Sequence, residues 1–169
     1  MADTRNLLRA YAVDRDEPPS ALVARLDRAG TALSLDLAAT LVVGRLSRAD
    51  AGAWRLLWSN AGHLPPLLLS AGRPRLLETE PELMLGVRDD TDRSDSAVVL
   101  LPGDTLVLYT DGLVERRDRP LDERLDLLTA TAQRAAAASP DVLAERLLGL
   151  APGAQDDVAL LVVQVTGAD

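Results

Sequence analysis

The sequence predicts an α+β fold in which helices flank an antiparallel β-sheet. Apolar residues recur at helical spacing near the N-terminus and again after residue 120, which predicts helices in both regions. The segments between them are short, rich in Leu and Val, and separated by polar turns, which is typical of antiparallel strands. The 169 residues, of which 47% are hydrophobic, are enough to bury the core of one domain that spans residues 1–169.

The N-terminal region predicts two helices. Residues 3–12 form the first, and a second begins after the Pro18-Pro19 pair. One face of this second helix carries the apolar side chains of Leu22, Val23, Leu26, Ala29 and Leu33.

The next part of the chain predicts strands of an antiparallel sheet. Residues 37–46 and 53–59, on either side of a polar turn, predict a β-hairpin. The motif at residues 60–63 interrupts the pattern, residues 67–69 resume it, and a short strand ends near Leu77 after a Ser-Ala-Gly turn.

The polar stretch at residues 78–96 predicts a structured loop around a short apolar segment at residues 83–87. Strands at residues 97–101 and 105–109 then flank Pro102-Gly103. Proline followed by glycine at the two central positions is typical of a type II turn, so we expect these strands to form a second hairpin.

The C-terminal region predicts two helices and a strand. The first helix covers residues 121–138, and Ser139-Pro140 begins another that runs to about Gly149. Residues 158–165 form a nearly continuous apolar strand, which suits a buried position in a sheet.

Composition excludes several classes of function. A formal net charge of −8 opposes binding to nucleic acid, whose affinity for proteins comes largely from Lys and Arg. The chain has no Cys, no Lys and a single histidine, His63, which excludes thiolate, Schiff-base and multi-histidine metal chemistry. No apolar run is long enough to cross a membrane, so we expect a cytoplasmic protein that does not bind membranes.

Two acidic clusters lie at the ends of apolar strands. Asp111 directly follows one strand, and Asp156-Asp157 directly precede Val158 of another. If the two strands are antiparallel neighbours, these carboxylates meet at one edge of the sheet and need a cation. Mg²⁺ and Mn²⁺ prefer such oxygen ligands. Each cluster alone is more typical of an ordinary turn than of a metal site, because Asp-Gly is among the commonest turn pairs and Asp-Asp before a strand suits a solvated turn.

Three motifs support a more specific hypothesis. They are Asn-Ala-Gly-His-Leu-Pro-Pro-Leu-Leu at residues 60–68, Leu-Pro-Gly-Asp-Thr-Leu-Val-Leu-Tyr-Thr-Asp-Gly-Leu-Val-Glu at 101–115, and Asp-Asp-Val-Ala-Leu-Leu-Val-Val at 156–163. Their sequence, order and spacing resemble the SpoIIE-like branch of the bacterial PPM, or type 2C, protein serine/threonine phosphatases. The resemblance implies a sandwich of two antiparallel sheets between helical layers.

The resemblance also implies a reaction. A pair of Mn²⁺ or Mg²⁺ ions would hold a water that attacks a phosphoserine or phosphothreonine phosphorus, so no side chain is expected to act as a catalytic nucleophile. Asp111 and Asp156 correspond to metal ligands, with Asp157 and Glu115 as candidates for the outer shell. The implied substrate of this hydrolase is a phosphorylated anti-sigma-factor antagonist or a similar regulatory phosphoprotein in signal transduction.

Other residues of the motifs have structural interpretations. Glu115 is equally typical of an exposed helix start, where acidic side chains interact favourably with the helix dipole. His63 lies in a Gly-Pro-rich turn, where a histidine more often forms structural hydrogen bonds than acts as a general acid. Asn60, Gly62 and Gly112 are expected to shape the turns of their motifs.

The chain departs from the family in one respect. Family members carry a Gly-Asp-x-x-Gly-His-Gly motif before the first helix, with an Asp that bridges both metals, and this sequence has no such motif. Its early acids, Asp3, Asp14 and Asp16, lack the flanking glycines and the preceding strand. We therefore expect an N-terminally truncated fold, the C-terminal portion of a phosphatase domain.

The missing motif leaves three functions open: an active phosphatase, a degenerate or truncated binding module that recognises a phosphoprotein without hydrolysing it, and a nonfunctional fragment. Absent strands would leave exposed sheet edges, which favour self-association or pairing with another segment. In this family, sensor domains usually lie N-terminal to the phosphatase domain.

Overall fold

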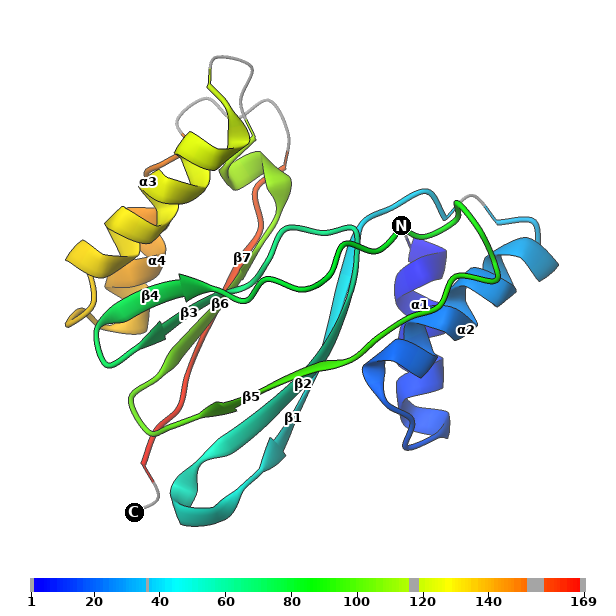
Figure 1. Cartoon of the computed structure of the whole chain (residues 1–169), viewed down its shortest axis with the longest axis horizontal. Helices are drawn as coiled ribbons and strands as arrows, with labels where there is room; N and C mark the ends of the chain where they lie inside the picture. The colour runs from blue at the N-terminus through cyan, green and yellow to red at the C-terminus, as the bar shows by residue number, and fades with distance from the viewer. Residues whose placement is uncertain (1, 36, 116–118, 152–156, 168–169) are drawn as a thin grey trace. The chain divides into compact units, whose positions relative to one another are not determined.

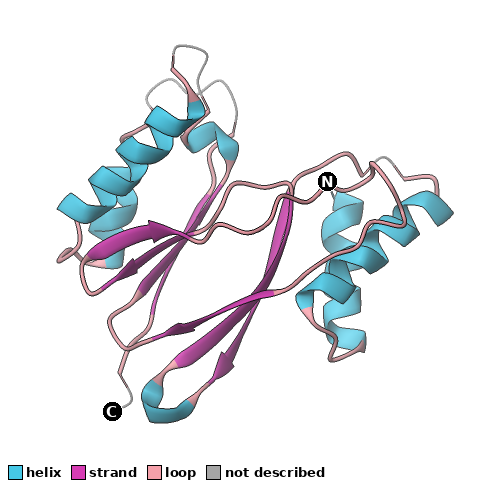
Figure 2. Cartoon of the chain, in the orientation of Figure 1, coloured by secondary structure: helices cyan, strands magenta, loops and turns pink. Residues whose placement is uncertain are grey.

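The α+β class is confirmed by the computed structural model, which describes residues 2–35, 37–115, 119–151 and 157–167. These residues contain four α-helices and two β-sheets (Figures 1 and 2). The chain divides into two compact units, each with one sheet and two helices. The first unit comprises Met1–Ala49, Trp54–His63 and Thr79–Val99, and the second comprises Asp50–Ala53, Leu64–Glu78 and Leu100–Asp169.

The first unit contains the two N-terminal helices and a three-stranded sheet. Its elements are α1 (Ala2–Asp14), α2 (Pro19–Ala32), β1 (Leu41–Arg48), β2 (Trp54–Ala61) and β5 (Ser96–Leu100), with strand order β1-β2-β5. The predicted first hairpin is confirmed, because β1 pairs antiparallel with β2 from Leu41 opposite Ala61 to Arg48 opposite Trp54. A short 3₁₀ turn, Asp50–Gly52, connects the two strands.

The core of the first unit forms where α2 packs on β1 and β2. The predicted apolar face of α2 is confirmed at Leu22, Val23 and Leu26, which are all buried. Leu33 was wrongly included in this face: the helix ends at Ala32, and the Leu33 side chain is 59% exposed.

The loop before β5 is structured, as predicted, and it packs on the same core. Leu85 from the predicted apolar segment is fully buried and forms an isolated antiparallel bridge with Ala39. Gly86 follows with φ +78°, and a Cβ there would lie only 3.1 Å from the backbone of Leu37 and Ala38. A close backbone approach therefore explains the glycine.

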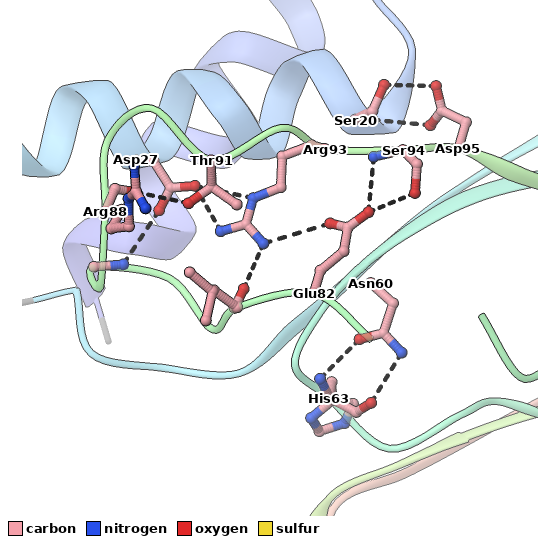
Figure 3. Close-up of polar contacts among 12 residues, drawn as sticks. Ser20, Asp27, Asn60, His63, Glu82, Arg88, Thr91, Arg93, Ser94 and Asp95 are labelled. Atoms are coloured by element: carbon pink, nitrogen blue, oxygen red, sulfur yellow. Dashed lines mark hydrogen bonds and ion pairs between the residues drawn. The ribbon is translucent and has the colours of Figure 1, made fainter. Parts of the chain in front are cut away.

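A buried ion pair attaches this loop to α2 (Figure 3). The Arg93 side chain donates through Nη2 to Asp27 Oδ2 at 2.7 Å and through Nε at 3.1 Å, and both side chains are 1% exposed. The other Asp27 oxygen accepts from the Gly86 amide at 3.2 Å. Arg93 Nη1 also donates to the Leu83 carbonyl. The sequence did not predict this network, which pairs residues 66 positions apart.

The second unit contains a four-stranded sheet and the two C-terminal helices. Its elements are β3 (Leu67–Ser70), β4 (Arg73–Leu76), β6 (Thr105–Tyr109), the 3₁₀ turn η2 (Asp111–Leu113), α3 (Leu121–Arg134), α4 (Pro140–Leu148) and β7 (Leu160–Gln164). The strand order is β4-β3-β6-β7, and every neighbouring pair is antiparallel. The two antiparallel sheets flanked by helices, which the resemblance implies, are thus confirmed.

The two helices of the second unit cover its sheet and bury the apolar residues Leu128, Ala132, Leu143 and Leu147 against Leu67, Leu69 and Val107. Helix α3 ends at Arg134, four residues before the predicted end at Ala138. Residues 135–138 form tight turns instead of a further helical turn. Pro140 disfavours the helical conformation at Ser139, the residue directly before it. No helix in the described parts of the chain is long and apolar enough to cross a membrane.

The predicted hairpin around Pro102-Gly103 is wrong, although the turn itself is present. Asp104 N donates to Leu101 O at 2.9 Å, and Gly103 has the positive φ of +92° that a type II turn requires at its third residue. However, β5 lies beside β2, whereas β6 pairs with β3 and β7. A type II turn has the wrong twist for a two-residue hairpin and splays the strands that flank it.

The ion pair between Arg93 and Asp27 generates a stability prediction. Arg93→Met leaves the Asp27 carboxylate buried without its partner, so we expect a loss of about 3–5 kcal/mol in the free energy of unfolding. Urea denaturation followed by circular dichroism measures this loss.

Arg88→Met is the matched control for Arg93→Met. Arg88 belongs to the same loop and binds Asp90 through two hydrogen bonds of 2.9 Å, but both partners are more than 60% exposed. We expect the unfolding midpoint of Arg88→Met to stay close to that of the wild type, because exposed ion pairs contribute little to stability. Equal midpoints for the two variants would contradict a stabilising role for the buried pair.

Candidate metal centre

Asp111 lies two residues after the end of β6 at Tyr109, at the start of the turn η2. Its backbone carbonyl accepts hydrogen bonds from Val114 N at 2.8 Å and from Glu115 N at 2.7 Å, and its Oδ1 accepts from Gly112 N at 2.8 Å. The Leu113 and Val114 side chains are buried in the core of the second unit, whereas Asp111 is exposed. The buried side chains of Leu113 and Val114 therefore fix the turn to the core, while Asp111 stays exposed to solvent.

The antiparallel pairing that would bring the two acidic clusters together is confirmed. β6 pairs with β7 so that Tyr109 lies opposite Leu160. Beyond the ladder, Thr110 N donates to Ala159 O at 3.0 Å. The Thr110 hydroxyl donates to Asp157 O at 3.1 Å and accepts from Ala159 N at 2.9 Å. Thr110 thus joins the segment that carries Asp111 to the one that carries Asp157.

The other predicted site residues are only partly described. Asp156 lies outside the described residues, and Asp157 and Glu115 are exposed. Within the described ranges, no group of three or more His, Asp or Glu side chains is placed to hold a metal ion. The carboxylate oxygens at the ends of these two neighbouring strands are of the type that hard divalent cations prefer. The ligand roles of Asp111 and Asp156 stay a prediction.

The structure adds two residues that the sequence reasoning did not single out as parts of the site. Thr110 joins the two acidic segments, and its position directly before Asp111 was the available signal. Arg124 lies on the buried face of α3 together with Leu128 and Ala132, and its guanidinium reaches the carbonyls of η2. An arginine at a core position of an amphipathic helix was the signal there.

The Asn60–His63 loop belongs to the first unit and is held by its own side chains (Figure 3). Asn60 Oδ1 accepts from His63 N at 2.7 Å, and Asn60 Nδ2 donates to His63 O at 2.9 Å. His63 Nδ1 lies 2.7 Å from Thr40 Oγ1. Gly62 has φ +69°, and a Cβ there would lie 3.0 Å from Met84 N. These contacts stabilise a tight turn and support structural roles for Asn60, Gly62 and His63.

Gly62 is required both for its positive φ and for the close approach of the Met84 backbone, and a comparison with Gly103 separates these two effects. Gly62→Ala combines the strain of a positive φ with a clash against the Met84 backbone. Gly103 also has a positive φ, but nothing lies within 4 Å of its Cβ position. We expect Gly103→Ala to cost about 1–2 kcal/mol and Gly62→Ala clearly more. Urea denaturation of both variants measures the difference, and a smaller loss for Gly62→Ala would be contrary to this account.

The comparisons with known proteins agree with one another. The SpoIIE family model, described as Stage II sporulation protein E, matches residues 1–166. The chain is similar to the RsbU and RsbW domains of Rv1364c from Mycobacterium tuberculosis, with 30% identity and a TM-score of 0.83, covering 100% of this chain and 48% of that chain.

Two further crystal structures share the fold at lower identity. The PP2C phosphatase domain and regulatory-domain fragment of SpoIIE from Bacillus subtilis is 18% identical, with a TM-score of 0.72, covering 97% of this chain and 49% of that chain. RsbX in complex with magnesium is 14% identical, with a TM-score of 0.71, covering 98% of this chain and 72% of that chain. The chain thus spans about half the length of the Rv1364c and SpoIIE structures.

Proposed function

Because the chain belongs to the SpoIIE family of PPM-type serine/threonine phosphatase domains, we propose that it hydrolyses phosphoserine or phosphothreonine in a regulatory phosphoprotein with the help of Mn²⁺ or Mg²⁺. The observation that carries this proposal is the pair of hydrogen bonds by which Thr110, next to Asp111, holds the segment of Asp157. The Thr110 hydroxyl holds the Asp157 segment beside the turn of Asp111, and these segments carry the two acidic clusters at the edge of one sheet.

The chain's own residues have separate tasks in the proposed reaction. Asp111 and Asp156 would hold the cation, while Asp157 and Glu115 would accept hydrogen bonds from the waters around it. A bound divalent cation supplies an activated water and neutralises the charge of the phosphoryl oxygens. Thr110 holds the two segments together, Gly112 N donates to the Asp111 carboxylate, and no side chain needs to form a covalent intermediate.

The proposed substrate is a phosphorylated anti-sigma-factor antagonist or a similar small regulatory protein. One relative supports this class: the Rv1364c structure, 30% identical to this chain, combines RsbU and RsbW domains. The net charge of −8 is consistent with a protein substrate and opposes nucleic acid as a partner.

A second candidate function is a phosphatase-fold module that binds a phosphoprotein without hydrolysing it. The observation in its favour concerns the side chains that could bind metal ions. The sequence has no Gly-Asp-x-x-Gly-His-Gly motif, and the described residues form no cluster of three metal ligands. Because hydrolysis needs an activated water and recognition of a phosphoprotein does not, binding and turnover must be measured separately.

Asp111→Asn tests the proposed cation site. Because an amide is neutral and binds divalent cations more weakly than a carboxylate, we expect any Mn²⁺-dependent hydrolysis of a phosphoserine peptide to fall to background. EDTA should have the same effect on the unaltered chain. Release of inorganic phosphate with and without Mn²⁺ measures both effects.

Asp141→Asn is the matched control, since Asp141 is an exposed acid in the first turn of α4 and lies in neither acidic cluster. Its turnover should equal that of the wild type. A wild-type chain that binds Mn²⁺ and the phosphopeptide but releases no phosphate would refute the enzyme proposal and favour the binding module.

A further inference from the structure

Arg124 is a charged residue in the core of the second unit. It shares one face of α3 with the buried residues Leu128, Thr131 and Ala132, and only 7% of Arg124 is exposed. Its guanidinium donates through Nη2 to Leu150 O at 2.7 Å and through Nε to Val114 O at 3.2 Å. Leu113 O lies 3.5 Å from Nη2 as a more distant acceptor.

These carbonyls need a donor because they lie at the ends of short helical segments. The turn η2 ends at Leu113, so the carbonyls of Leu113 and Val114 have no following helical turn to bond. Both residues are buried, at 0% and 1% exposure, and a buried carbonyl without a partner is costly. Leu150 follows the C-terminal end of α4, where carbonyl dipoles attract a positive charge.

One side chain therefore connects two segments of the chain around the candidate site. The first is the turn that begins with Asp111, and the second is the end of α4. The planar guanidinium suits this task because it directs several N–H groups at fixed angles, which an ammonium group does not do.

We propose that Arg124 is a positioning residue for the divalent-cation site, which sets the orientation of the Asp111 turn by bonding the Leu113 and Val114 carbonyls and tying them to Leu150. This inference rests on the proposed function, since it concerns the same cation site. Residues that orient metal ligands from outside the coordination sphere typically change metal affinity by 10–100-fold when they are replaced.

Electrostatics and positioning predict opposite effects on cation affinity. A guanidinium close to a cation site repels the cation, so removal of its charge alone would tighten binding. Loss of positioning would weaken binding, because the Asp111 carboxylate would then have to be ordered by the cation itself. The sign of the change therefore separates the two effects.

The first experiment measures the dissociation constant for Mn²⁺ by isothermal titration calorimetry. We expect Arg124→Met to raise this constant by at least about 10-fold. Arg124→Lys keeps the charge but loses the planar guanidinium with its N–H groups at fixed angles. Its dissociation constant should lie between those of the wild type and Arg124→Met.

Arg134→Met is the matched control, since Arg134 is exposed at the end of the same helix and its side chain donates to Thr131 Oγ1 at 2.8 Å. It should bind Mn²⁺ like the wild type. Urea denaturation shows which variants are folded. Unchanged or tighter Mn²⁺ binding by a folded Arg124 variant overturns the inference.

The second experiment needs no metal, and its first measurement uses the wild type alone. The amides of Val114 and Glu115 both bond the Asp111 carbonyl, so their hydrogen exchange reports whether the turn is ordered in advance. We expect both to be protected in the metal-free wild type, and to exchange at least about 10-fold faster in Arg124→Lys. The amide of Val165, bonded to Asp104 O at the other end of β7, should be unchanged. Unprotected wild-type amides at Val114 and Glu115 would overturn the inference even if every variant failed to fold.

The outcomes distinguish this inference from the proposed function. If the wild type binds Mn²⁺ and the folded Arg124 variants bind it equally well, the inference fails while the cation site stands. If the wild type does not bind Mn²⁺ at all, the cation site fails, and the positioning role fails with it.

Discussion

The antiparallel pairing of β6 with β7 is the constraint on which the candidate site depends. Asp111 and Asp157 are 46 positions apart in the sequence, and this ladder brings their backbones to the same edge of one sheet. The Thr110 hydroxyl extends the contact past the last strand pair by accepting from one backbone group and donating to another. Because these bonds involve the backbone, they hold the segments in place whatever cation the carboxylates bind.

Both units stabilise irregular backbone with a buried arginine. In the first unit Arg93 donates to the Leu83 carbonyl and pairs with Asp27, and in the second Arg124 donates to carbonyls at the ends of two helical segments. Loops and short turns leave carbonyl groups that no regular ladder satisfies, and burial makes each of them expensive. A long side chain with several donors meets this need from a neighbouring helix or within the loop itself.

Local patterns predicted most of the elements, because helix and strand periodicity depends on nearby residues. The Leu22, Val23 and Leu26 face of α2 and the β1–β2 hairpin are examples. The hairpin at Pro102-Gly103 was wrong because turn chemistry specifies the turn but not the partners of the flanking strands. The partners of Asp27 and Arg124 depend on tertiary structure, so the sequence could not identify them, although the core position of Arg124 on its helix was a local signal. For the metal centre, the sequence indicated Asp111, and the ligand assignment stays a prediction.

The Pro102-Gly103 turn has a consequence at the opposite end of β7. Gly103 N donates to Val165 O at 2.8 Å and Val165 N donates to Asp104 O at 2.9 Å, while Ala159 at the start of the strand is bonded by Thr110. The strand is thus fastened at both ends, which resists a register slip. A slip by one residue would turn each β7 side chain to the other face of the sheet and replace one acid of the Asp156-Asp157 pair by its neighbour. A glycine turn remote from the acids therefore helps to keep Asp157 in register with the Asp111 turn.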